Sequence, residues 1–189
     1  MKLLHLDSSI LGDNSASRAI SAAIVSSLTT ADPSLEVTYR DLAAEPLAHL
    51  TLDVLGNPEG TPELAQFLDA DVVVIGAGFY NFSIPSQLKA WIDRIAIAGK
   101  TFRYTAEGPV GLAGDKKVYV ALARGGYYGE GQPAAAFEHA ESYLRAVLGF
   151  IGVTEPTFVL AEGIAIDADT RAKSVAAAIE EAGSLAVAA

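Results

Sequence analysis

Short apolar runs alternate along the chain with longer segments in which apolar residues recur at helical spacing. The short runs predict five strands, at residues 3–6, 35–39, 72–75, 118–122 and 158–160. Helical spacing occurs in three sets: Ile20, Ile24 and Leu28; Leu88, Trp91, Ile92 and Ile95; and Leu144, Val147, Leu148 and Ile151. A last helix is expected from about residue 168 to near residue 183.

Strands that alternate with helices predict a parallel sheet covered by helices on both faces. The main candidate is an α/β fold, a flavodoxin-like doubly wound sheet of five strands in the order 2-1-3-4-5, which binds ligands at the carboxyl ends of its first and third strands. The length of 189 residues suits one domain, so we expect residues 1–189 to form a single unit. The segments 56–62 and 125–133 are rich in Pro and Gly and are predicted surface loops.

Composition and charge exclude several classes of function. Although 51% of the residues are apolar, no apolar run approaches the roughly 20 residues that span a bilayer. Asp7 interrupts the first run too early for a secretion signal, so we expect a cytoplasmic protein. The net charge of -10 without a basic cluster argues against nucleic acid as a partner. Because there is no cysteine, any redox chemistry has to come from a bound cofactor.

The loop after the first strand has features of a phosphate site. Ser15 and Ser17 fall where the next helix is expected to begin. A helix start offers unpaired N–H groups and a partial positive charge, both of which suit a phosphate. The alternative is that Ser15 only caps the helix.

The loops after the third and fourth strands would leave the same edge of the sheet. Phe79, Tyr80 and Phe82 could lie along a flat ring, and Asn81 tolerates unusual backbone angles. In the segment 123–126, two glycines would let the main chain approach a ligand, and Arg124 would favour an electron-rich group. Taken singly, the aromatic residues could be core plugs and the glycines only a turn. The three loops together predict a site for a planar cofactor that carries a phosphate.

Other familiar sites find no support in the sequence. No GxGxxG follows the first strand, and no GxxxxGK[ST] phosphate loop occurs. His5, His49 and His139 do not pair at metal-ligand spacing, so no metal site is predicted. A hydrolase with a GxSxG nucleophile is likewise not indicated.

A series of motifs, in their order and spacing, matches one family. They are SSI with S-x-S at 8–17, YNF and QLK at 80–89, TFRYT with GP-x-GL at 101–112, RGG at 124–126, LGFIG at 148–152 and AEGI at 161–164. Over nearly its whole length the chain resembles the FMN-dependent NADH:azoreductase and quinone reductase family.

The resemblance implies a homodimer with one non-covalent FMN per subunit near the subunit interface, reduced by NADH or NADPH. The implied FMN-binding residues are Ser9, Ser15, Ala16 and Ser17 at the phosphate, Phe79, Tyr80, Asn81 and Phe82 beside the flavin ring, and Ala123, Arg124, Gly125 and Gly126 at its pyrimidine end. An apolar slot for nicotinamide and acceptor would be formed by Tyr104, Tyr127, Tyr128 and Phe150. The implied acceptors are flat quinones, azo dyes and nitroaromatics. No side chain is implied as catalytic, because the flavin carries the hydride.

The chain departs from the family pattern at Ala16 and Ala123, where relatives carry polar residues, and in a shorter segment at 47–62. These departures leave the substrate range and the choice of NADH or NADPH open. Two other classes share the expected fold: an electron-carrier flavodoxin and a non-flavin signalling domain. The carrier would not consume NADH rapidly with a quinone, and the signalling domain needs an aspartate where the third strand ends in Ile75 and Gly76.

Overall fold

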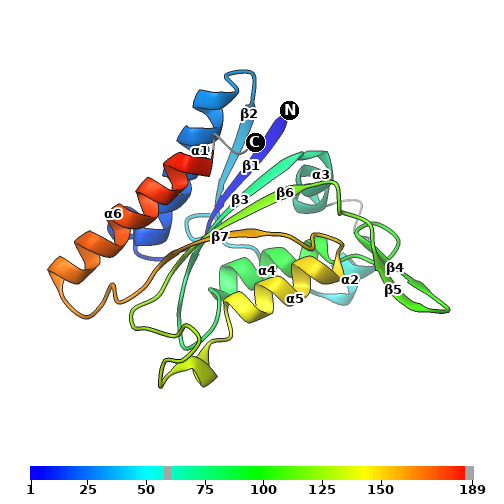
Figure 1. Cartoon of the computed structure of the whole chain (residues 1–189). Helices are drawn as coiled ribbons and strands as arrows, with labels where there is room; N and C mark the ends of the chain where they lie inside the picture. The colour runs from blue at the N-terminus through cyan, green and yellow to red at the C-terminus, as the bar shows by residue number, and fades with distance from the viewer. Residues whose placement is uncertain (58–60, 186–189) are drawn as a thin grey trace.

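A parallel sheet of five strands forms the centre of the molecule (Figure 1). The computed structural model describes residues 1–57 and 61–185. The sheet has the order β2-β1-β3-β6-β7, with strands β1 Lys2–Asp7, β2 Glu36–Asp41, β3 Val72–Gly78, β6 Lys117–Ala123 and β7 Thr157–Ala161. Renumbered among themselves, these strands have the order 2-1-3-4-5, so the predicted sheet is confirmed.

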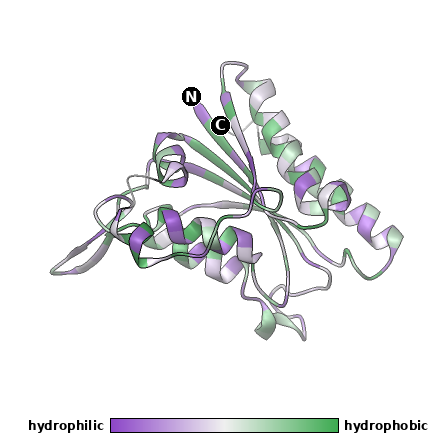
Figure 2. Ribbon diagram, turned by 180° about the vertical axis from the view of Figure 1, so that it is seen from behind, coloured by the Kyte–Doolittle hydropathy of each residue, from purple (hydrophilic) through white to green (hydrophobic). Residues whose placement is uncertain are grey.

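Helices lie on both faces of the sheet (Figure 1). One face carries α1 Ala16–Ala31 and α6 Ala168–Ser184, and the other carries α3 Pro62–Asp69, α4 Ser86–Ile95 and α5 Glu141–Phe150. Successive strand residues supply the two cores in turn: Leu3 packs with α1 and α6, whereas Leu4 packs with α3, α4 and α5. Figure 2 shows the resulting hydrophobic strands inside helices of mixed polarity. In the described part of the chain, no helix is long and apolar enough to cross a membrane.

The predicted helix stripes are confirmed as core. Leu88, Trp91, Ile92 and Ile95 of α4 are all at least 96% buried, which fixes the end of the loop that follows β3. Two strands extend beyond their predicted ends: β2 runs to Asp41 instead of residue 39, and β3 runs to Gly78 instead of residue 75. Because β2 is a largely exposed edge strand, its apolar residues do not mark its ends. The small residues at the end of β3 continue the ladder with β6 although they end the apolar run.

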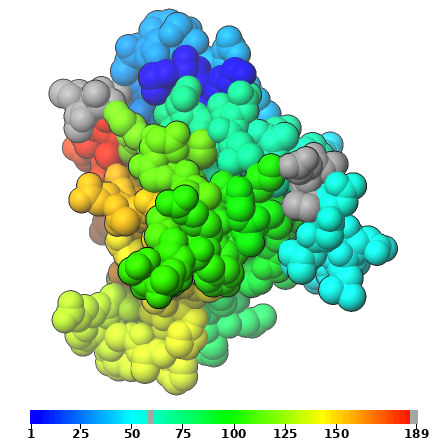
Figure 3. All heavy atoms as spheres, turned by 90° about the vertical axis from the view of Figure 1, so that its right-hand side faces the viewer, coloured from blue at the N-terminus to red at the C-terminus, as the bar shows by residue number. Residues whose placement is uncertain are grey.

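A β-hairpin, helix α3 and three short helical elements lie outside the helices and strands predicted by residue. Strands β4 Phe102–Thr105 and β5 Gly108–Gly111 pair antiparallel, and the short elements are α2 Leu52–Gly56, η1 Gly12–Asn14 and η3 Ala135–Phe137. Figure 3 shows the hairpin, in green, on the same face as the cyan segment that contains α2. The predicted loop at 125–133 is confirmed, while residues 58–60 of the predicted loop at 56–62 lie outside the described residues.

Candidate functional site

A cavity of about 200 Å³ lies at the carboxyl end of the sheet, between the loops that follow β1, β3, β6 and β7. The predicted site residues that line it are Ser9, Ser15, Ala16, Ser17, Phe79, Tyr80, Ala123 and Gly125. The sequence prediction missed Leu11, Gly78, Ile164, Ala165 and Arg171. Three segments far apart in the chain therefore meet as predicted, and the β7 loop with α6 adds a fourth wall.

The start of α1 presents hydrogen-bond donors to one end of this cavity. Ser15 is the N-cap, and its Oγ accepts a bond from the N–H of Arg18 at 3.3 Å and lies 3.1 Å from Ser17 Oγ. The N–H groups of Ala16 and Ser17, in the first helical turn, find no acceptor among the described residues. Ser15 thus caps the helix, as the alternative interpretation expects, and the helix start still has free donors for an anion.

Arg18 is engaged by the protein itself. Its guanidinium donates two hydrogen bonds of 2.7 Å to the carboxylate of Asp41 and further bonds of 2.9 and 3.2 Å to the carbonyl oxygen of Ser9. The hydrogen bond from Arg18 lowers the pKa of Asp41, against the opposing effect of burial. Arg18 therefore holds the β1 loop in place.

A tight turn with unusual backbone angles follows β3. Tyr80 and Ser83 exchange two backbone hydrogen bonds, of 2.9 and 3.1 Å, around Asn81 with a φ of 49° and Phe82 with a φ of 73°. Two positive φ angles in succession are those of a type I′ turn. Asn accepts this conformation readily, but Phe does not, and the left-handed region costs such a residue about 1–2 kcal/mol. Strain of this kind is concentrated at functional sites.

The side chains around this turn divide between cavity and surface. Phe79 lines the cavity and packs on Tyr128 with ring centroids 4.6 Å apart, and the Tyr80 hydroxyl lies 2.9 Å from Ser9 Oγ. The ring of Phe82 instead stacks on Phe137 at 5.0 Å and is half exposed. Within one chain the ring of Phe82 therefore packs outside the cavity lining, and its predicted place beside a planar ligand stays a prediction.

The glycines after β6 serve both packing and ligand access. The carbonyl oxygens of Gly125 and Gly126 accept bonds from Ala165 and Gly163 in the β7 loop, at 3.0 and 3.1 Å. A Cβ atom on Gly125 would lie 3.2 Å from the side chain of Ala165, so the two loops pack closely here. The N–H groups of both glycines lack an acceptor in the described ranges, which leaves them for a ligand.

Arg124 has a different place from the predicted one. Its side chain is 1% exposed, and its guanidinium contacts Glu141 at 2.6 Å, Glu162 at 3.2 Å and Glu138 at 3.4 Å. Glu162 in turn accepts the N–H of Tyr128 at 2.9 Å. The guanidinium thus pairs with three carboxylates that lie outside the cavity lining, and its predicted contact with an electron-rich group of a ligand stays a prediction.

The predicted substrate slot is only partly assembled within one chain. Tyr128 packs on Phe79, which lines the cavity, whereas Tyr127 is exposed beside α6. Tyr104 is 73% exposed on the hairpin. Its ring and that of Phe150 both contact Phe102, with ring centroids 5.5 and 4.4 Å apart. In Figure 1 the hairpin and the end of α5 lie apart from the loops after β1 and β6.

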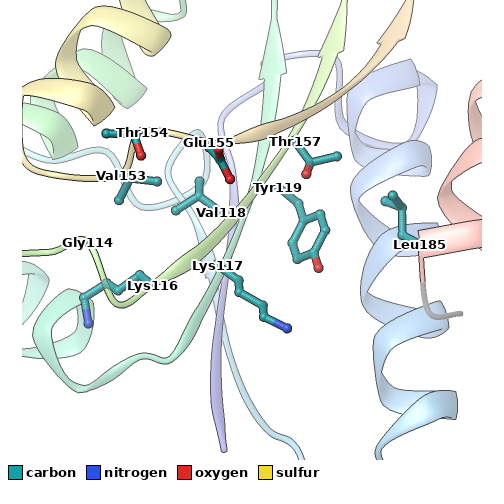
Figure 4. A pocket seen from close by; sticks show the side chains of 10 residues that line it. All are labelled: Gly114, Lys116, Lys117, Val118, Tyr119, Val153, Thr154, Glu155, Thr157 and Leu185. Atoms are coloured by element: carbon teal, nitrogen blue, oxygen red, sulfur yellow. The ribbon is translucent and has the colours of Figure 1, made fainter. Parts of the chain in front are cut away.

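A second hollow, of about 470 Å³, lies at the opposite end of the sheet (Figure 4). It is formed around the first residues of β6 and β7, with Lys117 and Glu155 on exposed positions. Ligands of open α/β sheets bind at the carboxyl ends of the strands, so we assign the candidate site to the smaller cavity. No group of three or more His, Asp or Glu residues in the described ranges is arranged to hold a metal ion.

Comparison with known proteins identifies the family. A family model described as "Flavodoxin-like fold" matches residues 1–185. The FMN-dependent NADH:quinone oxidoreductase of Xanthomonas campestris pv. campestris is 59% identical over 195 aligned positions, which cover 94% of this chain and 96% of that protein. The chain belongs to this oxidoreductase family. A relative of the same description from Bradyrhizobium diazoefficiens is 57% identical, with 98% of each chain covered.

Solved structures agree with this family assignment. An azoreductase from Bacillus anthracis has a TM-score of 0.88 and 35% identity, with 98% of each chain covered. An FMN-dependent NADH-azoreductase from the same species, in complex with FMN, has a TM-score of 0.83 and 26% identity, covering 98% of this chain and 99% of that one. The family predicted from the sequence motifs is confirmed, and the carrier and signalling alternatives are not favoured.

Proposed function

We propose that this protein is an FMN-dependent NADH oxidoreductase that reduces quinones and azo compounds. The observation that carries the proposal is a cavity with free N–H donors at two ends and an aromatic wall between them. One set of donors belongs to Ala16 and Ser17, and the other to Gly125, which lines the cavity, and the adjacent Gly126. No carboxylate lines this cavity in the described part of the chain, so no negatively charged side chain of the lining repels an anionic cofactor.

The donors present fit the parts of FMN. Ser15 and Ser17, with the helix start, would hold the phosphate, and Phe79 and Tyr80 would flank the flavin ring. The unpaired N–H groups of the glycine loop suit the carbonyl-bearing edge of the flavin. The chemistry that bound FMN supplies is the acceptance of hydride from NADH and the reduction of an acceptor in a second half-reaction. The chain itself would bind and orient the cofactor, and we propose no side chain as catalytic.

The proposal includes a homodimer. The hairpin, the residue that follows it and α2 carry exposed apolar residues, namely Leu52, Leu55, Tyr104, Val110 and Leu112. Figure 3 shows the hairpin on the same face as the segment that contains α2. Apolar surface of this kind marks a protein interface where it is contiguous, so we propose this face as the contact between two copies. A second copy docked on this face would bury Tyr104, and the slot predicted from Tyr104, Tyr127, Tyr128 and Phe150 would then be shared between two chains.

The remaining parts of the proposal follow from the chemistry. We expect residues 1–189 to act as one FMN-binding domain in the cytoplasm, where NADH is available. Flat electron-poor acceptors, including nitroaromatics, would be selected by stacking. We expect NADH to be the electron donor, with NADPH as the alternative.

A spectrum and a coupled assay test the proposal. The purified protein should take up FMN, absorb at flavin wavelengths and oxidise NADH rapidly when menadione is added. The double variant Ser15→Ala with Ser17→Ala should bind FMN more weakly and riboflavin almost unchanged, because only FMN carries a phosphate. Failure to bind FMN at micromolar concentration would refute the proposal. Binding of FMN without oxidation of NADH would instead favour the electron-carrier alternative.

A further inference from the structure

Arg171, in the first turns of α6, is a half-buried cation without a carboxylate partner in the described part of the chain. The arginines nearest to the cavity loops, Arg18 and Arg124, are each paired with carboxylates. The guanidinium of Arg171 donates to the backbone carbonyl of Asn14, and no ion pair neutralises it. Its other four N–H groups have no acceptor among the described residues.

The position of this guanidinium is as informative as its charge. Asn14 directly precedes Ser15, the N-cap of α1, and Arg171 lines the same cavity as Ser15 and Ser17. α1 and α6 lie side by side on one face of the sheet (Figure 1). Among the described residues that line the cavity, Arg171 is the one with a charged side chain, in a chain whose net charge is -10.

Building on the proposed function, we propose that Arg171 binds the phosphate of FMN and makes the site selective for FMN over riboflavin. The serines and the helix start offer hydrogen bonds and only a partial charge. Ala16 adds no side-chain donor, so Arg171 is the lining residue that can bring a full positive charge to the phosphate. Arginine suits this role because its planar fork can donate two bonds to two phosphate oxygens.

The start of α6 holds this side chain in place. Asp167 caps the helix by accepting the N–H of Thr170 at 2.7 Å, and its carbonyl oxygen accepts the N–H of Arg171 at 3.0 Å. Hydrogen bonds from the backbone and side chain of Thr170 lower the pKa of Asp167, so this carboxylate is occupied in capping the helix. The guanidinium is thus presented by a rigid helix turn, and a bound phosphate would not have to order it.

The test compares flavin affinities of the full-length apoprotein by quenching of flavin fluorescence. Arg171→Gln should weaken FMN binding by roughly 10- to 100-fold, the effect of losing a charge-assisted bond, and leave riboflavin binding within about twofold. Arg171→Lys should recover part of the loss. Lys173→Gln is the matched control, because it removes the same charge from an exposed position two residues further along α6. It should bind both flavins as the wild type does.

A pH series sharpens the comparison. A phosphate monoester loses its second proton near pH 6, so the difference between wild type and Arg171→Gln should be larger at pH 7.5 than at pH 5. Equal weakening of FMN and riboflavin would give Arg171 a purely structural role and overturn the inference, as would unchanged FMN binding. If the wild type binds neither flavin, the proposed function itself fails. If it binds riboflavin as tightly as FMN, the flavin site stands and phosphate recognition by Arg171 is refuted.

Discussion

Replacing Arg124 by methionine should destabilise the protein by about 3–4 kcal/mol without a selective loss of FMN affinity. The guanidinium is 1% exposed and stands between Glu138, Glu141 and Glu162. Removing one partner of a buried ion pair costs about 3–5 kcal/mol, because the opposite charge is left without compensation. We expect the lower part of this range, since the three carboxylates are 12–24% exposed and water can partly solvate them.

Urea unfolding of the apoprotein at pH 7, followed by circular dichroism, measures this loss. The control is Arg145→Gln, which removes another cation that pairs with Glu141, at 2.8 Å, from a side chain that is 51% exposed. An exposed pair of this kind contributes roughly 0.2–1 kcal/mol. The contrast between the two variants therefore isolates burial from the mere loss of a positive charge.

The loss should also depend on pH in a definite direction. Burial raises the pKa of Glu138, but hydrogen bonds from the N–H groups of residues 140–142 and the charge of Arg124 outweigh it, so the pKa is lowered. A carboxyl with a lowered pKa stabilises the fold above its unfolded pKa, and this contribution is lost as the pH falls through the folded value. The gap between wild type and Arg124→Met should therefore be widest near pH 7 and narrow toward pH 4.

Two results would refute this reasoning. A loss below about 1 kcal/mol at pH 7 would mean that the three carboxylates do not depend on the guanidinium. A normal stability combined with strongly weakened FMN binding would restore the role that the sequence predicts for Arg124, a contact with the cofactor.

Three further predictions concern the core, the sheet and the β1 loop. Trp91→Ala should cost about 3–5 kcal/mol in urea unfolding and leave FMN affinity unchanged, because its ring is 1% exposed in the core; an unchanged stability would contradict the packing of α4. Gly76→Ala should lower the free energy of unfolding by about 1–3 kcal/mol or more, since the new Cβ would lie 2.2 Å from Oδ1 of the buried Asp7. The control Gly149→Ala in α5 meets nothing within 4 Å and should raise the free energy of unfolding by about 0.5–1 kcal/mol. Arg18→Gln should lower the free energy of unfolding by about 1–2 kcal/mol at pH 7. Arg18 lowers the pKa of Asp41, so the carboxylate stabilises the fold fully above its unfolded pKa, and the difference between wild type and variant should disappear as the pH falls below about 4. A difference that does not change with pH would exclude this ion pair as its source.

The sheet could be predicted from the sequence because its strands are buried on both faces. Residues 72–75 form an unbroken apolar run, and β3 is buried throughout. The hairpin of β4 and β5 carries no such signal, since most of its residues are exposed and its two strands form a small sheet separate from the central one. Alternation in the segment 102–105 and the Gly-Pro pair at 108–109 are the signals that could have suggested it.

The site was predictable where it depends on local motifs and not where it depends on contacts distant in sequence. Serines at a helix start and glycines after a strand act through their own backbone, so the sequence shows them directly. The direction of the Arg124 side chain depends on Glu141 and Glu162, which lie 17 and 38 residues further along the chain. Arg171 and Asn14 are 157 residues apart, and no local pattern could have brought them together.

Side-chain hydrogen bonds connect the loops of the cavity in pairs, and these bonds lower the entropy that the loops lose when a ligand binds. The bond between Ser9 and Tyr80 joins the loops after β1 and β3, and Glu162 joins the loops after β6 and β7 through Arg124 and Tyr128. Loops held in this way lose little conformational freedom when a ligand enters, so more of the contact energy appears as affinity. The same bonds occupy most of the polar side chains near the cavity. Free backbone N–H groups and one unpaired guanidinium are left for the ligand, and such a set of donors selects an anion with a carbonyl-rich ring.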